Sequence, residues 1–117
     1  MINTSPNTQR KVSVIFELSA DGTVLYFRNS ASANDFSVDL KPSPVGRNFF
    51  EMEFFGNTAE LWRRYNSFLK SHDSVENFKF MLNVDNQPVP TKVMLMRVIE
   101  RSNNERAQSI IVDIRSV

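Results

Sequence analysis

The sequence contains no cysteine and only one histidine, His72. The absence of thiols excludes disulfides, iron–sulfur clusters, thiolate zinc sites, thiol nucleophiles and cofactors attached through sulfur. A single imidazole also excludes a metal site built from several histidines. The composition therefore excludes many of the sites by which small proteins act as enzymes or metalloproteins.

A strong net charge and long apolar runs are also missing. The sequence has 14 Lys and Arg against 13 Asp and Glu, so its net charge of +1 gives no long-range attraction to nucleic acid. No apolar run approaches the roughly 20 residues of a membrane span, and residues 1–10 lack the apolar core of a secretory signal. We therefore expect a cytoplasmic domain that binds neither nucleic acid nor membrane.

Phenylalanine, in contrast, is abundant, with 10 Phe in 117 residues. This length suits one domain with a sizeable core. We expect residues 1–11 to form a flexible arm or cap and residues 12–117 to form a single domain. The Phe content predicts either a heavily aromatic core or an aromatic-lined pocket.

Alternating apolar and polar residues predict strands at both ends of the domain, because successive side chains of a strand point to opposite faces. Between them, Leu61, Tyr65 and Phe68 recur at helical spacing. Residues 29–40 are rich in Asn, Ser, Ala and Asp, and we expect loops and short helical turns there. This order predicts an α+β domain in which helices pack on one face of a five-stranded antiparallel sheet. The expected elements are strands at 12–18 and 24–28, a helix at 58–70, and strands at 78–84, 93–99 and 109–115, with a polar connection at 101–106.

The order of these elements and several short segments resemble the PAS domain family. Residues 18–26 (Leu-Ser-Ala-Asp-Gly-Thr-Val-Leu-Tyr) resemble its opening hairpin, and residues 45–51 (Val-Gly-Arg-Asn-Phe-Phe-Glu) resemble its segment before the long helix. Within the family, residues 46–50 and residues 90–93 (Pro-Thr-Lys-Val) are similar to the photoactive yellow protein branch. The resemblance covers about residues 12–115, and it implies the PAS fold and a role in signal transduction.

The resemblance ends where the photoactive yellow protein branch carries its light-sensing chemistry. Its chromophore is attached to a cysteine shortly after the Phe-Phe pair, whereas residues 51–56 here (Glu-Met-Glu-Phe-Phe-Gly) contain none. Phe27 and Ala31 stand near the positions where that branch has its chromophore-binding Tyr and Glu. A thioester chromophore and a flavin–cysteine adduct are both excluded. The resemblance therefore implies a light-insensitive relative without a resident cofactor, and it leaves noncovalent haem or flavin open.

We expect no enzymatic activity, because no catalytic constellation is recognisable. Glu51 and Glu53 diverge on a strand and on a helix alike, so they do not form a carboxylate pair. His72 lies between Ser71 and Asp73 at the end of the predicted helix. Haem-binding relatives use a histidine of this helix that faces the cavity, and we favour a surface position for His72.

The Phe-rich segments have two interpretations. Their side chains fill the space between sheet and helix, or they line an apolar cavity for a small ligand such as haem, flavin or a fatty acid, as in PAS relatives. Packing in the core is the commoner role of aromatic residues in a small domain. The candidate ligand-binding residues are Phe27, Phe49, Phe50, Phe54, Phe55, Tyr65 and Phe68.

Apolar residues also occur on the strand faces opposite to the predicted core. Antiparallel sheets usually leave one face to water, so an apolar second face predicts a partner. We favour another copy of the chain over the N-terminal arm or an output helix. The candidate interface residues are Ile15, Met94, Met96, Val98 and Ile111.

The end of the last predicted strand, Asp113-Ile114-Arg115, resembles the Asp-Ile-Thr ending through which many PAS domains pass a signal to a following segment, although its third residue differs. The resemblance implies that Asp113, Ile114 and Arg115 transfer the signal, that the domain belongs to a longer protein of the bacterial type, and that an output domain follows Val117. The sequence thus predicts a sensory or regulatory PAS module that acts through dimerisation.

Overall fold

A computed structural model describes residues 12–29, 43–52, 58–84, 87–102 and 105–117 of the chain. The predicted arm at residues 1–11 and most of the predicted loop region at residues 29–40 lie outside the described residues. In the part of the chain that the structure describes, no helix is long and apolar enough to cross a membrane.

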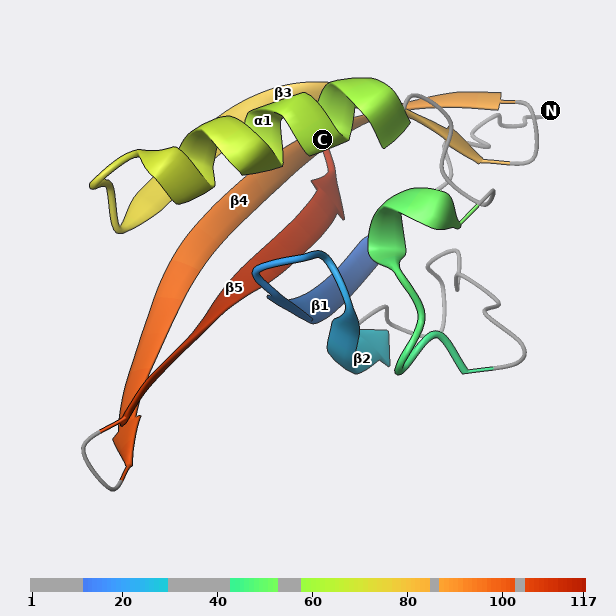
Figure 1. Cartoon of the computed structure of the whole chain (residues 1–117). Coiled ribbons are helices and arrows are strands. Elements are labelled where there is room, and N and C mark those ends of the chain that lie inside the picture. Colours follow the sequence, from blue (N-terminus) through green and yellow to red (C-terminus); the bar gives the residue numbers. More distant parts are fainter. Residues whose placement is uncertain (1–11, 30–42, 53–57, 85–86, 103–104) are drawn as a thin grey trace, which may run out of the picture.

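Five antiparallel strands form one sheet in the order β2-β1-β5-β4-β3. The first strand pairs with the last in the middle of the sheet, while α1 lies across one face of it (Figure 1). The predicted α+β architecture and the helix at residues 58–70 are confirmed. The elements are β1 (Ser13–Ser19), β2 (Val24–Asn29), the short 3₁₀ helix η1 (Phe49–Glu51), α1 (Thr58–Lys70), β3 (Val75–Val84), β4 (Gln87–Ser102) and β5 (Glu105–Ser116).

The hairpin formed by β4 and β5 is longer than the sequence predicts. The expected polar connection at residues 101–106 is wrong, because the two strands stay paired up to Ser102 and Glu105. Strand pairing is held by backbone hydrogen bonds, which do not need the apolar alternation that marks the buried part of each strand. The apolar alternation therefore indicates which part of the hairpin is buried, and not where its two strands end.

Two prolines, Pro88 and Pro90, lie inside β4, although proline is disfavoured within a sheet. Pro90 is opposite Met81 of β3, and its carbonyl oxygen accepts a hydrogen bond of 3.0 Å from the Val117 N–H on the other side of the strand. The missing N–H of Pro90 therefore points away from β3, and Pro88, two residues earlier, has the same orientation. The pairing of β3 with β4 loses no hydrogen bond.

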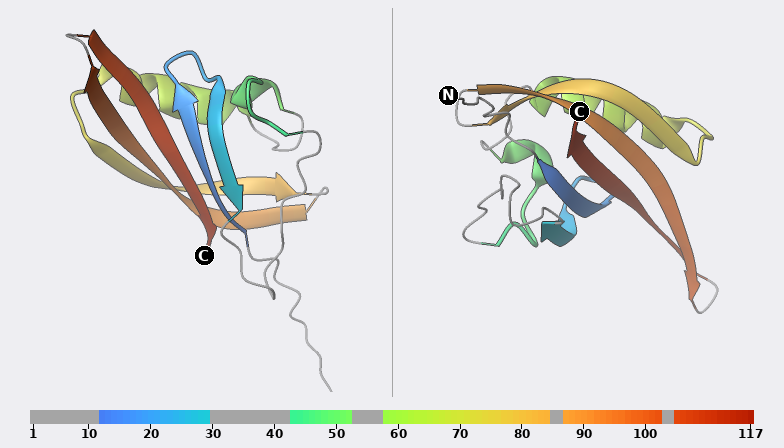
Figure 2. Two further views of the ribbon diagram at one scale, coloured as in Figure 1. Left: turned by 90° about the horizontal axis from the view of Figure 1, so that it is seen from below. Right: turned by 180° about the vertical axis from the view of Figure 1, so that it is seen from behind.

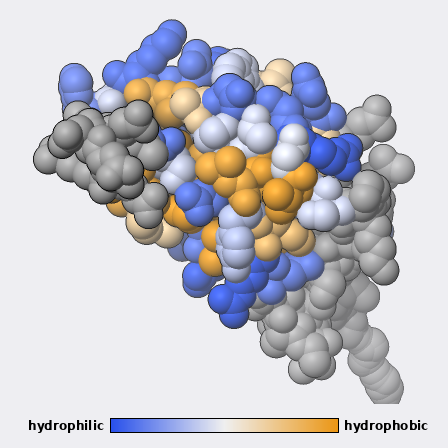
Figure 3. All heavy atoms as spheres, turned by 60° about the horizontal axis from the view of Figure 1, so that its bottom comes forward, coloured by the Kyte–Doolittle hydropathy of each residue, from blue (hydrophilic) through white to orange (hydrophobic). Residues whose placement is uncertain are grey.

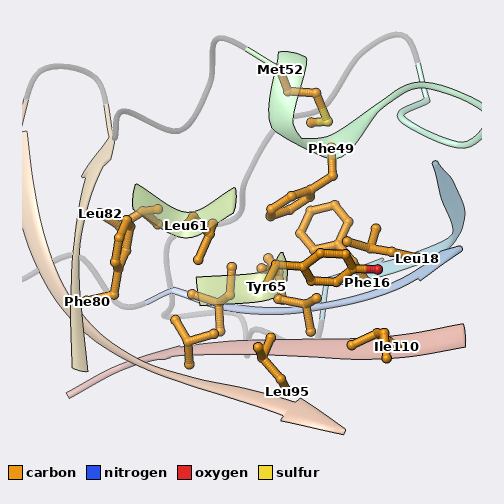
Figure 4. Packing of buried hydrophobic residues seen from close by; sticks show 14 of the residues in the cluster. Phe16, Leu18, Phe49, Met52, Leu61, Tyr65, Phe80, Leu82, Leu95 and Ile110 are labelled. Carbon is orange, nitrogen blue, oxygen red and sulfur yellow. The ribbon is translucent and has the colours of Figure 1, made fainter. Parts of the chain in front are cut away.

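The core lies between the sheet and the two helical elements (Figure 4). Strand side chains such as Phe16, Leu95 and Ile110 meet Leu61 of α1 and Phe49 of η1, and all five are almost completely buried. Burial of apolar surface of this kind is the main source of folding stability.

The C-terminal end of α1 is held by Arg97, which the strand alternation places on the core side of β4. Its Nη2 donates hydrogen bonds to the carbonyl oxygens of Phe68 (2.7 Å) and Ser71 (3.1 Å), and its Nε donates to the carbonyl oxygen of Asp73 (3.2 Å). Helix C-termini expose unpaired carbonyls with partial negative charge, which a guanidinium satisfies. Arg97, which is 29 residues from Phe68 in the sequence, thus supplies the donors for the carbonyl groups at the C-terminal end of α1.

Candidate functional site

The face of the sheet opposite α1, which we call the outer face, brings the predicted interface residues together. Ile15 lies in the same cross-strand row as Asp113 and Met94, and the next row holds Ile111 and Met96. Val98 follows on β4, two residues after Met96 and therefore on the same face. All five predicted interface residues lie on the outer face: Ile15, Met94, Met96, Val98 and Ile111.

None of the described elements covers the outer face. Seen from below, the strands lie in front of α1 (Figure 2, left). From a similar direction, hydrophobic residues gather in the centre of the molecule and hydrophilic residues surround them (Figure 3). The five predicted interface side chains are half-buried, so each still presents apolar surface to solvent.

An ion pair lies at the edge of this apolar centre. The two oxygens of Asp113 accept hydrogen bonds from Nε (3.1 Å) and Nη2 (3.2 Å) of Arg115. Asp113 is only 7% exposed, between Ile15 and Met94 in its row, and such a buried carboxylate needs the bidentate pairing that a guanidinium supplies. Of the three predicted signal-transfer residues, Asp113 and Arg115 therefore share the outer face, whereas Ile114 is fully buried in the core.

A hollow of about 480 Å³ opens on the outer face next to this ion pair. Met94 from the predicted interface and both Asp113 and Arg115 from the predicted signal-transfer group line it, together with the last residue, Val117. The two predicted sites are thus continuous in space. The described residues that line this hollow are Asn77, Lys92, Met94, Asp113, Arg115, Ser116 and Val117.

A second polar contact on the outer face was not predictable from the sequence. The hydroxyl of Ser109 lies 2.7 Å from Oε2 of Glu17, to which it donates a hydrogen bond. Glu17 is directly opposite Ile111, and Ser109 is opposite Val98. The only signal for this contact would have been the pairing register of β1 and β5, which the sequence pattern does not contain.

The five predicted ligand-binding residues that the structure describes lie on the core side of the sheet. Phe49, Phe68 and Tyr65 are buried, and Phe27 and Phe50 pack partly buried against the same cluster. Phe54 and Phe55 lie outside the described residues.

The described aromatic rings contact one another directly. The ring centroids of Phe16 and Phe49 are 4.8 Å apart, and those of Phe50 and Tyr65 are 5.0 Å apart. Separations of this size are those of packed aromatic pairs. No ligand fits between these rings, and a pocket elsewhere among the candidate residues stays a prediction.

The turn between β1 and β2 contacts both η1 and α1. Gly22 has a φ of 94°, and a Cβ atom there would lie 2.8 Å from the ring of Phe50, so both the conformation and the space require glycine. The Tyr65 hydroxyl donates a hydrogen bond of 2.6 Å to the Ser19 carbonyl oxygen. Burial, and secondarily the charge of Asp21, raise the pKa of Tyr65, which keeps this donor protonated.

His72 lies on the surface beyond the end of α1. It lines a hollow of about 390 Å³ together with Ser71, Arg97, Ile99 and Gln108. Arg97 already donates to the helix carbonyls, and among the described residues no group of three or more His, Cys, Asp or Glu is placed to hold a metal ion. We therefore take the outer face, and not this hollow, as the candidate functional site.

Known proteins resemble this chain in structure more than in sequence. No protein-family model matches the chain, and no curated protein matches its sequence. Among solved structures, it is similar to the crystal structure of the PAS domain of an HTR-like protein from Haloarcula marismortui, with a TM-score of 0.58 and 20% identity over 90% of this chain and 81% of that chain. The chain has the PAS fold.

The PAS fold confirms the predicted fold class. Membership of the photoactive yellow protein branch stays a prediction. In this PAS fold, the packed aromatic cluster and the exposed apolar residues lie on opposite sides of one sheet.

Proposed function

We propose that this PAS-fold domain is a sensory or regulatory signalling module that acts by forming a homodimer through its outer face, and not by catalysis. The observation that carries the proposal is the apolar centre of that face, which the described elements leave uncovered. A contiguous exposed apolar patch on a sheet is typical of an interaction site. The structural similarity to a PAS domain of an HTR-like protein supports a signalling role.

A second copy of the chain suits this face. Closed two-fold dimers are the commonest oligomers, and they require a surface that is complementary to itself. The outer face carries charges of both signs, with Glu17 and Asp113 against Lys92 and Arg115. Two such faces meet without a uniform repulsion between like charges.

The proposed interface reaches the end of β5, where a following output domain would be attached. Ser116 N–H donates to the carbonyl oxygen of Val12 (2.8 Å), and Val117 N–H donates to that of Pro90 (3.0 Å). Because β5 stays tied to β1 and β4 up to its last residues, a change in the contacts of Asp113 or Arg115 acts close to the point where the chain leaves the sheet. We infer that dimer geometry is passed to the output domain there.

Sedimentation of matched variants tests the homodimer. Ile111→Glu places a charge in the centre of the outer face, and Ile99→Glu places the same charge on the opposite side of β4, where Ile99 is already 46% exposed. Between about 1 μM and about 1 mM, wild type and Ile99→Glu should dimerise and Ile111→Glu should stay monomeric, with unchanged far-UV circular dichroism. A wild-type protein that is monomeric throughout contradicts the proposal.

A further inference from the structure

Two of the chain's methionines, Met94 and Met96, lie two residues apart in the centre of the outer face. Met94 is opposite Asp113 on one side and Asn77 on the other, while Met96 is opposite Ile111. Both side chains are half-exposed in the single chain, and Met94 also lines the hollow of about 480 Å³. Small solutes therefore reach this pair when the outer face is uncovered.

The other described methionines have different surroundings. Met52, which directly follows η1, is 3% exposed and belongs to the core. Met81 is 48% exposed, opposite Pro90 near the end of β3. Exposure thus distinguishes a protected methionine, an open one, and a central pair that would be covered only in the dimer.

We propose that Met94 and Met96 make the homodimer sensitive to peroxide, so that their oxidation to methionine sulfoxide releases monomers. This proposal rests on the proposed function. In each oxidation, the thioether sulfur attacks one oxygen of hydrogen peroxide, an S–O bond forms and the O–O bond breaks. The released oxygen leaves as water after proton transfer; the sulfur is oxidised by two electrons and the peroxide is reduced by two.

Oxidation would weaken the dimer because it replaces an apolar group with a strong hydrogen-bond acceptor. A buried acceptor without a donor is unfavourable. Met96 has only apolar side chains opposite it, Ile111 in β5 and Val75 in β3, so its sulfoxide would find no donor in its row. Met94 is opposite Asp113 in β5, whose oxygens are acceptors already paired with Arg115, but also opposite Asn77 in β3, whose side-chain amide is a donor. Most of the expected loss therefore comes from Met96.

Dimerisation should in turn protect Met94 and Met96 from oxidation. Anything that binds one state more tightly shifts the equilibrium towards it, so a dimer that disfavours sulfoxides must also shield the two thioethers. Oxidation of Met94 and Met96 should slow down as protein concentration rises. Oxidation of Met81 should stay fast and that of Met52 slow at every concentration.

The test compares wild type with Met94→Leu/Met96→Leu and with Met81→Leu, each before and after hydrogen peroxide. Leucine keeps the apolar volume but cannot be oxidised. Peptide mass spectrometry assigns the oxidised positions, sedimentation gives the dimer dissociation constant, and circular dichroism reports folding. Wild type and Met81→Leu should dimerise at least about tenfold more weakly after oxidation, and the double leucine variant should not change. Methionine sulfoxide reductases should restore the wild-type dimer.

Each failure has a different meaning. If the wild-type protein carries oxygen at Met94 and Met96 and still dimerises as before, the peroxide proposal is wrong and the homodimer stands. The proposal also fails if the double leucine variant loses its dimer to the same extent, or if oxidation unfolds the wild-type domain. If the untreated protein is monomeric at about 1 mM, the proposed homodimer is wrong and the peroxide proposal falls with it.

Discussion

The two faces of the sheet are built from similar apolar strand residues, yet only one of them is covered. Ile110 and Ile111 are neighbours in β5, but Ile110 is fully buried beneath the helical elements and Ile111 is half-exposed on the outer face. The core face meets α1, η1 and the turn at Gly22, whereas the outer face meets no element of the described chain. Covering elements, and not strand composition, therefore decide which apolar face becomes the core.

The largest difference in stability is expected when each of the two neighbouring isoleucines is replaced with alanine, one at a time. Ile110→Ala should lower the free energy of unfolding by about 2–5 kcal/mol, because it leaves a cavity in a sealed core. Ile111→Ala should cost less, about 1–2 kcal/mol in the dilute monomer, because its side chain is only half-buried. Urea unfolding at low protein concentration measures both values. Equal losses of unfolding free energy in the two variants would contradict the proposed difference in covering between the two faces.

The next effect concerns the edge of the core face, where Arg97 caps α1. Arg97→Met should lower the free energy of unfolding by about 1–3 kcal/mol, because it leaves the carbonyls of Phe68, Ser71 and Asp73 without this donor. Arg63→Met removes an exposed arginine of α1 and should cost less than about 0.5 kcal/mol. Thermal unfolding followed by circular dichroism compares them, and a harmless Arg97→Met would show that the cap is dispensable.

A smaller effect is expected from Tyr65, whose hydroxyl bridges the core to the turn between β1 and β2. Tyr65→Phe should cost about 1 kcal/mol at neutral pH through loss of the hydrogen bond to Ser19.

The pH dependence provides a second measurement on the same residue. The raised pKa of Tyr65 means that the unfolded chain loses this proton first, so the contribution is fully present below the ordinary value of 10.0 and is lost as pH rises above it. Tyr65→Phe should remove this alkaline loss of stability, whereas Tyr26→Phe, which changes an exposed tyrosine, should retain it. An unchanged alkaline profile in Tyr65→Phe would contradict this assignment.

The smallest effect should be found at Asp21, in the exposed turn. Hydrogen bonds from the Ser19 hydroxyl, and then from the backbone and hydroxyl of Thr23, lower the pKa of Asp21. Its contribution is present above the ordinary value of 3.8 and is lost as pH falls through the lower folded value. The melting temperature of Asp21→Asn should therefore depend less on pH in this acidic range than that of wild type, and a parallel decline of the two would refute the assignment.

The sequence predicted the parts of the fold that repeat at a fixed spacing. The alternation around Val14 and Phe16 marks the buried face of β1, and the spacing of Leu61, Tyr65 and Phe68 marks the buried face of α1. The full length of the last hairpin was missed because backbone pairing leaves no apolar pattern there. The role of Arg97 as a helix cap was not predictable from the strand pattern, since it depends on where a distant helix ends.

The candidate site was likewise predictable only where it depends on the spacing of residues along a strand. Alternation was sufficient to place Ile15 and Ile111 on one face, because that depends only on strand period. The burial of Asp113 and the contact between Ser109 and Glu17 were not predictable, because they depend on which residues the register sets side by side. The direct ring contacts of the described aromatic residues on the core side were not predictable either, because they arise only from three-dimensional packing.

Pro88 and Pro90 also bear on the behaviour of the protein at high concentration. The pairing of β4 with β5 begins at Thr91, so residues 87–90 extend past β5 and have no strand on that side within the described chain. Open strand edges recruit strands of other molecules and start aggregation. Pro90 faces Val117 on that side, whereas Pro88 turns its side without an N–H towards the opening, so an incoming strand finds one donor missing there. A residue that is disfavoured within a sheet thus makes this open edge a poorer template for strands of other molecules.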